Sequence, residues 1–246
     1  MEHWEALAPG GLRFVYDDTL FRPGTDTFLL SSLPRLKPGL QVCDLGCGTG
    51  LLGLLLLQRQ RELTVTGVEI QEQAAALAAV CAEANNIADR FTVRRGDLRQ
   101  IRDLLPGGSF DLVVCNPPYY PTDSGALSPN DPRRTARSEV TCTLEEVCGA
   151  AAWLLRWGGS FCLVHKPERL TDLLYSLRAS GLEPKRLRFV CKNGDSAPSL
   201  LLLEARRGGK PGLTAEPPLL LQKPDGSPTP ELDTIYFRTP STEETL

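Results

Sequence analysis

The alternation of apolar and polar residues along the chain predicts a regular succession of strands and helices. From residue 40 onward, short apolar runs alternate with longer segments of helical periodicity. The short runs predict strands at Gln41–Asp44, Thr64–Ile70, Phe91–Arg95, Phe110–Cys115, Ser160–His165, Arg186–Cys191 and Leu200–Ala205. The longer segments predict helices at Leu51–Arg59, Glu72–Ala84, Leu144–Leu155 and Pro167–Ser180. Continuous apolar runs such as Leu112–Cys115 suit strands covered on both faces, so we expect a parallel sheet between two layers of helices.

The last two predicted strands are separated only by residues 192–199, which are rich in Gly, Asp, Ser and Pro. This connection is too short for a right-handed crossover, so the two strands should pair antiparallel. A Rossmann-like α/β fold with a seven-stranded, mostly parallel sheet, an antiparallel last strand and helices on both faces is associated with class I methyltransferases. Dinucleotide-binding dehydrogenases continue with parallel strands instead.

The two ends of the chain follow different patterns from the middle. Near the start, Leu12–Tyr16 is strand-like, and Thr25 or Asp26 can cap a short apolar helix. Near the end, loop signals surround a short strand at Leu219–Gln222 and a capped helix near Pro230–Tyr236. We expect three parts: a lead-in packed on the ligand site (1–39), a main domain (40–205) and a C-terminal appendage (206–246).

Composition describes an ordinary soluble globular protein, with 41% apolar and 23% charged residues among 246. The longest leucine-rich stretch, Leu51–Leu57, is too short to cross a bilayer, and the N-terminus lacks the basic start and apolar core of a signal peptide. The eight cysteines form no CxxC pair, and the chain has only two histidines. We therefore expect a cytoplasmic protein with no membrane segment, no metal site and cysteines that act as small hydrophobic residues.

A glycine-rich turn, Gly46-Cys47-Gly48-Thr49-Gly50, follows the first strand of the main domain and opens its first helix. Its glycines allow positive φ values and close backbone approach, but NAD-binding folds use a similar turn. The discriminating residue is Asp44, because a carboxylate there would repel a pyrophosphate. It suits the positively charged ammonium and sulfonium end of S-adenosylmethionine (SAM).

Two further acidic residues stand at successive strand ends. Glu69, at the second strand, can accept hydrogen bonds from both ribose hydroxyls, and Asp97, after the third strand, can accept one from the adenine amino group. Each alone is compatible with ordinary strand-end or helix-cap chemistry. Together with Asp44 at the ligand-binding edge of the sheet, they favour a SAM site.

The sequence Asn116-Pro117-Pro118-Tyr119 follows the fourth strand of the main domain. The exocyclic amine of adenine is a poor nucleophile because its lone pair is delocalised into the ring. The side-chain oxygen of Asn116 and the carbonyl of Pro117 can accept the two amine hydrogens, which favours a pyramidal nitrogen aimed at the methyl group. Tyr119 can stack on the base, and Pro117 with Pro118 stiffens the turn. We assign Asn116 to both the catalytic and the donor-binding set; the alternative is a proline-rich turn without function.

On these motifs and several others the chain resembles the bacterial tRNA-adenine N6-methyltransferases that modify the adenine next to the anticodon of valine tRNA. The resemblance extends over nearly the whole chain and includes Phe21–Leu30, Asn116–Tyr120, Gly125–Asn130, Ala136–Glu139, His165–Leu170 and Gly209–Leu213. It implies methyl transfer from SAM to the N6 amine of the adenine 3′ to the anticodon of tRNA-Val. The implied partner is the anticodon stem-loop, and we expect the protein to be a monomer.

Arginines are concentrated in the segment 121–138, which has no clear periodicity. A net charge of −3 is not typical of a protein that binds nucleic acid non-specifically through a basic surface. Local clusters of basic residues are therefore more informative than the total charge. Long loops in compact domains are usually functional or disordered. We expect Arg133, Arg134 and Arg137 to contact anticodon-stem phosphates; the alternative is a solvated loop.

Other substrates for the same N-methylation chemistry are a release-factor glutamine, a DNA adenine and a ribosomal RNA base. Residues 1–39 are too few for the helical domain that glutamine enzymes usually carry, and the chain has no room for a separate DNA-recognition domain. A non-catalytic protein that binds SAM or RNA is a further alternative. The set Asp44, Glu69, Asp97 and Asn116 argues against it.

Overall fold

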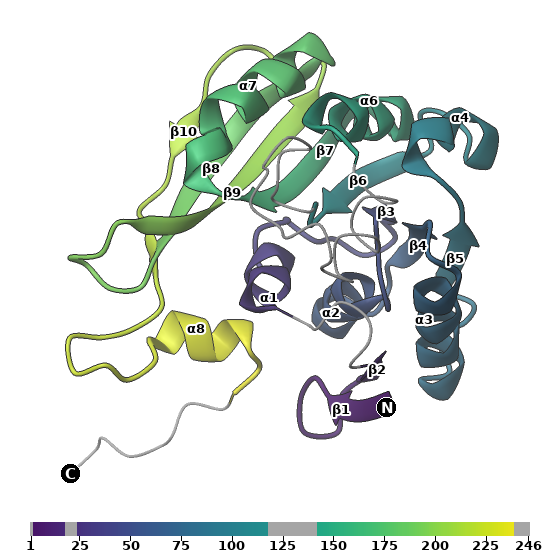
Figure 1. Cartoon of the computed structure of the whole chain (residues 1–246), viewed down its shortest axis with the longest axis horizontal. Coiled ribbons are helices and arrows are strands. Elements are labelled where there is room, and N and C mark those ends of the chain that lie inside the picture. Colours follow the sequence, from purple (N-terminus) through teal and green to yellow (C-terminus); the bar gives the residue numbers. More distant parts are fainter. Residues whose placement is uncertain (1, 18–23, 118–141, 239–246) are drawn as a thin grey trace, which may run out of the picture.

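A mostly parallel β-sheet with helices on both faces forms the centre of the protein (Figure 1). The computed structural model describes residues 2–17, 24–117 and 142–238. Seven strands make up the body of the sheet: β3 (Gln41–Leu45), β4 (Thr64–Glu69), β5 (Phe91–Arg95), β6 (Phe110–Cys115), β7 (Leu155–His165), β8 (Leu182–Cys191) and β9 (Pro198–Arg207). They lie in the order β8-β9-β7-β6-β3-β4-β5, and β9 runs antiparallel to both of its neighbours. The predicted class I methyltransferase topology is confirmed.

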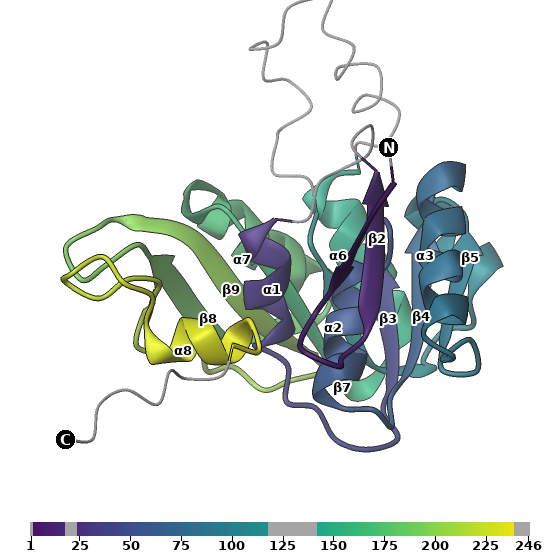
Figure 2. The same cartoon turned by 90° about the horizontal axis from the view of Figure 1, so that it is seen from below.

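Each face of the sheet packs against its own set of helices (Figures 1 and 2). One set is α1 (Thr25–Ser31), α2 (Leu51–Arg59) and α3 (Glu72–Ala84); the other is α4 (Ile101–Leu104), α6 (Leu144–Leu154) and α7 (Leu170–Ala179). Successive strand residues point to opposite faces, so Val42 and Val114 join the first core, whereas Cys43 and Val113 join the second. This double burial explains why the sequence of these strands is continuously apolar.

The edges of the predicted elements differ from the structure where turn-forming residues interrupt the apolar pattern. Strand β7 begins at Leu155, five residues before the predicted start, because the pair Gly158-Gly159 reads as a turn although it lies within the strand. The predicted helix over 167–180 divides into a 3₁₀ turn, η2 (Pro167–Arg169), and α7. A second 3₁₀ turn, η1 (Leu98–Gln100), precedes α4.

The lead-in contains one more strand than its sequence predicts. Strands β1 (Glu2–Ala6) and β2 (Arg13–Asp17) form an antiparallel hairpin. The expected cap of α1 is wrong: Gly24 in extended conformation occupies the N-cap position, and Asp26 instead accepts a hydrogen bond from the backbone of Thr27. Leu7 and Phe14 of the hairpin lie in the same core as helix α2.

The C-terminal segment extends the sheet and covers one end of it. Two short strands, β10 (Thr214–Ala215) and β11 (Leu219–Leu220), pair parallel with β8, so the sheet has nine strands rather than seven. Helix α8 (Pro230–Ile235) begins at an N-cap, Thr229, whose hydroxyl accepts from Leu232 N–H at 3.2 Å, as the sequence predicts. The expected boundary at residue 205 falls within β9, and the three-part division stays a prediction.

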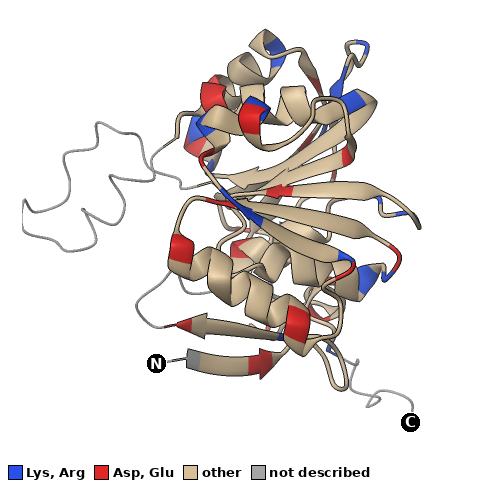
Figure 3. Ribbon diagram, turned by 90° about the vertical axis from the view of Figure 1, so that its right-hand side faces the viewer, with Lys and Arg blue, Asp and Glu red and all other residues tan. Residues whose placement is uncertain are grey.

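The distribution of charged residues and cysteines over the described residues agrees with what the composition predicts. Acidic and basic residues are interspersed over the described ribbon (Figure 3). All eight cysteines are free, and all except Cys142 are buried. Within the described ranges, the helices are all too short or too polar to cross a membrane.

Candidate active site

The carboxyl ends of β3, β4 and β6 bring the predicted site residues to one edge of the sheet. Leu45 is in register with Val68 on β4 and with Cys115 on β6. The residues that follow, Gly46, Glu69 and Asn116, therefore leave the sheet at the same level on adjacent strands. The strand order alone places the glycine-rich turn, which we expect to bind the donor, beside the motif expected to hold the methyl acceptor.

The glycine-rich turn adopts the backbone conformation that its sequence predicts. Gly46, Gly48 and Gly50 have φ values of 71°, 55° and 84°, and Gly50 is the N-cap of α2. A Cβ atom on Gly50 would lie 2.8 Å from the ring of Phe91, whereas one on Gly46 or Gly48 would meet nothing within 4 Å. Gly50 is thus required for packing as well as for its φ, while the other two line open space that a ligand can approach.

Glu69 connects the end of β4 to the turn. Its side chain is 5% exposed. Oε2 accepts the backbone N–H of Gly48 at 2.9 Å, and Oε1 accepts that of Gln71 at 2.8 Å. An ionised carboxylate can accept about four hydrogen bonds, so these two leave acceptor capacity for hydroxyl groups. The predicted ribose contact stays a prediction, and the structure adds a positioning role toward the turn.

Asp44 is the most deeply buried of the predicted acids. It is 1% exposed, and its Oδ2 accepts the backbone N–H of Gly53 at 3.2 Å. Burial, with a smaller contribution from the negative charge of Glu69, raises the pKa of Asp44 to about 7, although the Gly53 hydrogen bond opposes the shift. A positive group at this position would relieve the unfavourable burial of the charge. Asp44 therefore fits the cationic end of SAM.

Asp97 has a partner that the sequence analysis missed. It caps η1 through Arg99 N–H at 2.9 Å, and the guanidinium of Arg99 donates to its Oδ2 from Nε at 2.8 Å. The side-chain hydrogen bond from Arg99 is the main cause that lowers the pKa of Asp97. An Asp followed two residues later by Arg, directly after a strand, was the available signal. A ligand amino group would share Asp97 with Arg99.

Asn116 contacts a residue from the lead-in. Its Nδ2 donates to Thr27 Oγ1 at 3.0 Å, and Thr27 is 7% exposed on helix α1. Pro117 is buried beside it. Pro118, Tyr119, Arg133, Arg134 and Arg137 lie outside the described residues, so their assigned roles stay predictions.

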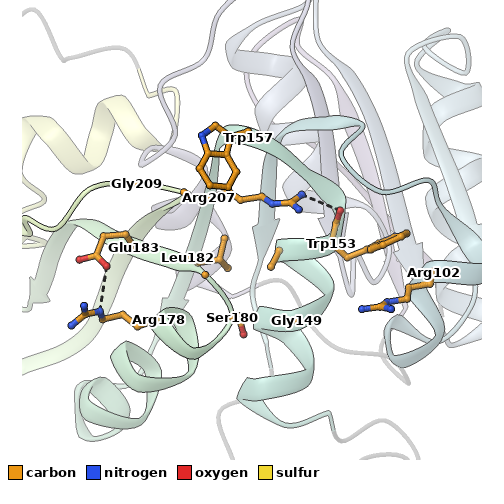
Figure 4. A pocket seen from close by; sticks show the side chains of 13 residues that line it. Arg102, Gly149, Trp153, Trp157, Arg178, Ser180, Leu182, Glu183, Arg207 and Gly209 are labelled. Carbon is orange, nitrogen blue, oxygen red and sulfur yellow. Dashed lines mark hydrogen bonds and ion pairs between the residues drawn. The ribbon is translucent and has the colours of Figure 1, made fainter.

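A cavity of about 690 Å³ lies at the opposite edge of the sheet (Figure 4). It is lined by α4, the ends of α6 and α7, the starts of β7 and β8 and the end of β9, including Trp153, Trp157 and Arg207. Arg207 donates to the backbone carbonyl of Trp153, and Arg178 pairs with Glu183 at 3.3 Å. Its lining contains none of the predicted site residues, so it is separate from the candidate site.

Comparison with known proteins places the chain in a family and agrees with the fold. A family model described as the methyltransferase small domain matches residues 15–173. A tRNA1(Val) (adenine(37)-N6)-methyltransferase of Porphyromonas gingivalis is 34% identical over 207 residues, which cover 75% of this chain and 80% of that protein. One of Tolumonas auensis is 31% identical and covers 90% of this chain and 92% of its own length.

Solved structures share the fold at lower identity. A protein of Agrobacterium tumefaciens described as a predicted O-methyltransferase aligns with a TM-score of 0.71 at 21% identity, over 87% of this chain and 98% of that one. A geranyl diphosphate methyltransferase in complex with SAM aligns with a TM-score of 0.54 at 18% identity, over 73% of this chain and 83% of that one. The family matches confirm the resemblance found in the sequence. The chain belongs to the methyltransferase small domain family and to the family of the tRNA1(Val) (adenine(37)-N6)-methyltransferases.

Proposed function

We propose that the protein transfers the methyl group of SAM to the N6 amine of adenine 37 in tRNA1(Val). Family membership supports the reaction class, and one observation carries the proposal in this chain. The buried acid Asp44 and the amide of Asn116 stand at the ends of adjacent strands, β3 and β6. Donor and acceptor groups therefore meet at one edge of the sheet.

The residues of the site fit SAM. Asp44 offers a buried carboxylate to the positive end of the donor, Gly46 and Gly48 leave room for it, and Glu69 keeps acceptor capacity for the ribose. Asp97, held by Arg99, is assigned to the adenine amino group. When bound, SAM supplies an electrophilic methyl group.

The protein's own task in the reaction is to orient the target amine. Asn116 Oδ1 and the Pro117 carbonyl accept the two amine hydrogens, which localises the nitrogen lone pair toward the donor site. A strong general base is not needed, because the amine becomes acidic only as the methyl group is transferred. Tyr119 holds the adenine after the base has left the stack of the anticodon loop. Extracting a base from a loop requires less free energy than extracting it from a duplex. Under this proposal the protein acts on the anticodon stem-loop in the cytoplasm, as a monomer.

The direct test is transfer of labelled methyl from SAM to total tRNA from cells that lack the modification, followed by nucleoside analysis. We expect the label as N6-methyladenosine in tRNA-Val. A tRNA-Val transcript with guanine at position 37 is the matched control and should remain unlabelled. Intact SAM binding without label in any tRNA would contradict the proposal and move the search to DNA, ribosomal RNA or release-factor glutamine.

Arg133 and Arg134 are expected to contribute to tRNA binding rather than to chemistry. Replacing both with alanine should raise KM for tRNA with little change in kcat, because phosphate contacts position the RNA. The slope of log(kcat/KM) against log salt should become shallower by about 1.8 if both residues contact phosphates. Arg178→Ala, at the opposite edge of the sheet, is the control, with a side chain that is 65% exposed. Unchanged RNA kinetics in the double variant would assign the two arginines to solvent.

A further inference from the structure

The contact between Thr27 and Asn116 joins the lead-in to the proposed catalytic motif. The two residues are 89 positions apart in sequence, and their side chains meet at 3.0 Å. Thr27 lies in the first turn of α1, where its own N–H donates to Asp26 Oδ1 at 2.9 Å and to Gly24 O at 3.2 Å. The backbone that carries the Thr27 hydroxyl is therefore fixed locally.

Other hydroxyl side chains at the end of the same helix behave differently. Ser31 Oγ donates to the carbonyl of Phe28 at 2.6 Å, and Ser32 Oγ donates to that of Leu29 at 2.7 Å. Such bonds within a helix are the usual arrangement for Ser and Thr. The Thr27 hydroxyl accepts a hydrogen bond from another element, at a position that is 7% exposed.

The Asn116 amide contacts Thr27 through its donor end. The planar amide carries an acceptor oxygen and a donor NH₂, and a half-turn of the group exchanges them. Only the amide oxygen can accept a hydrogen bond from an exocyclic amine. If the NH₂ group occupied its place, two hydrogen-bond donors would face each other and no bond would form. Because Nδ2 is directed to Thr27, Oδ1 is directed away from α1.

We propose that Thr27 is a positioning residue for methyl transfer, whose hydroxyl holds the Asn116 amide so that Oδ1 faces the target amine. This inference rests on the proposed function and assigns a role in it to a residue of the lead-in. The lead-in then contributes to the chemistry as well as to the core. Without the hydroxyl, this orientation of the amide loses one hydrogen bond and is less favoured over the unproductive one.

The test compares Thr27→Val, which keeps the shape and removes the hydroxyl, with Thr27→Ser, which keeps the hydroxyl. We expect Thr27→Val to lower kcat about 5- to 10-fold, the factor that corresponds to one lost hydrogen bond. KM for tRNA and Kd for SAM should stay within about twofold. Thr27→Ser should retain near wild-type kcat, as should Ser32→Ala, whose hydroxyl donates to a carbonyl of α1 rather than to the catalytic motif.

Wild-type kcat in Thr27→Val would overturn the inference, and so would equal losses in the valine and serine variants. A readout without substrate separates this inference from the proposed function. The side-chain amide signals of Asn116 in a ¹H–¹⁵N spectrum, identified by their absence in Asn116→Ala, should shift in Thr27→Val and remain in place in Thr27→Ser. If the wild type methylates no tRNA, the proposed function fails, while the spectrum still decides whether Thr27 holds the amide. Unshifted signals in Thr27→Val, with an unchanged Tm, would refute the contact itself.

Discussion

Replacing Asn116 with alanine is expected to lower kcat by about 10²- to 10³-fold, the usual effect of removing one group that stabilises developing charge. The side chain follows β6, beside the donor-binding turn, and its amide is anchored to Thr27. Its loss removes an acceptor for the amine hydrogens, so the lone pair of the target nitrogen stays delocalised. Because Asp44 and Glu69 remain in place, Kd for SAM should change by less than about threefold.

Single-turnover methylation of tRNA and calorimetric titration of SAM measure the two quantities separately. Asn116→Asp retains acceptor oxygens and should lose less activity than the alanine variant. Ser109→Ala, whose exposed hydroxyl bonds to Pro106 O before the start of β6, is the distant control and should retain full activity. A kcat near that of the wild type in Asn116→Ala would refute the catalytic role assigned to this residue. A large loss of SAM affinity would show that its main role lies in donor binding.

The parts of the fold that the sequence predicts well are those in which burial acts along a regular period. Strand β6 and helices α2 and α3 have the predicted bounds because their apolar residues continue without interruption or repeat at helical spacing. Where a short element depends on partners distant in sequence, the pattern is too weak. Strand β1, which pairs with β2, and the two-residue strand β10, which pairs with β8, were not predicted. The predicted strand at Leu219–Gln222 is present but shortened to β11, which also pairs with β8.

The same distinction between local and long-range features applies to the candidate site. The positions of Asp44, Gly46 and Glu69 in the fold were predictable because turn chemistry and strand ends are local features of sequence. The partner of Asn116 is not local. Thr27 reaches Asn116 only because α1 packs on the sheet, and no pattern in either segment specifies that contact. The pair Asp97–Arg99 is local, but the sequence alone does not distinguish it from two independent surface charges.

The affinity for SAM is expected to depend on pH through Asp44. Burial raises the pKa of this carboxyl to about 7 in the ligand-free protein, and the positively charged donor binds the ionised form. Protonation therefore competes with binding, and Kd should increase about tenfold between pH 7.5 and pH 6, with release of a proton on binding in that range. Loss of charge from the donor's own amino group, whose ordinary pKa is about 7.7 to 8.0, begins only near the upper end of this range and acts in the opposite direction.

Asp44→Asn separates this carboxylate from the other groups that titrate in the same range. The variant should bind SAM about 10- to 100-fold more weakly at pH 7.5, because it loses a charged partner, and its Kd should be flat between pH 6 and 7.5. Asp172→Asn, which removes an exposed ion pair with Arg169, should reproduce the wild-type profile. A wild-type Kd that does not vary with pH would contradict the assignment of Asp44 to the cationic end of the donor.

The same residue should act in the opposite direction on the stability of the ligand-free protein. Between the ordinary pKa of 3.8 and the folded value of about 7, the folded state keeps a proton that the unfolded state has released. The contribution of Asp44 to the free energy of unfolding should therefore fall as pH rises through this range, by roughly 4 kcal/mol at most. The difference between wild type and Asp44→Asn separates this contribution from that of His165, whose lowered pKa acts in the opposite direction. In Asp44→Asn this decline should disappear, so the variant should be more stable than the wild type at pH 8 while binding SAM less tightly.

Chemical denaturation at pH 5 and pH 8, with and without SAM, measures both effects in one set of samples. If Asp44→Asn instead made the protein less stable than the wild type at pH 8, Asp44 would serve packing, through its bond to Gly53, more than ligand binding.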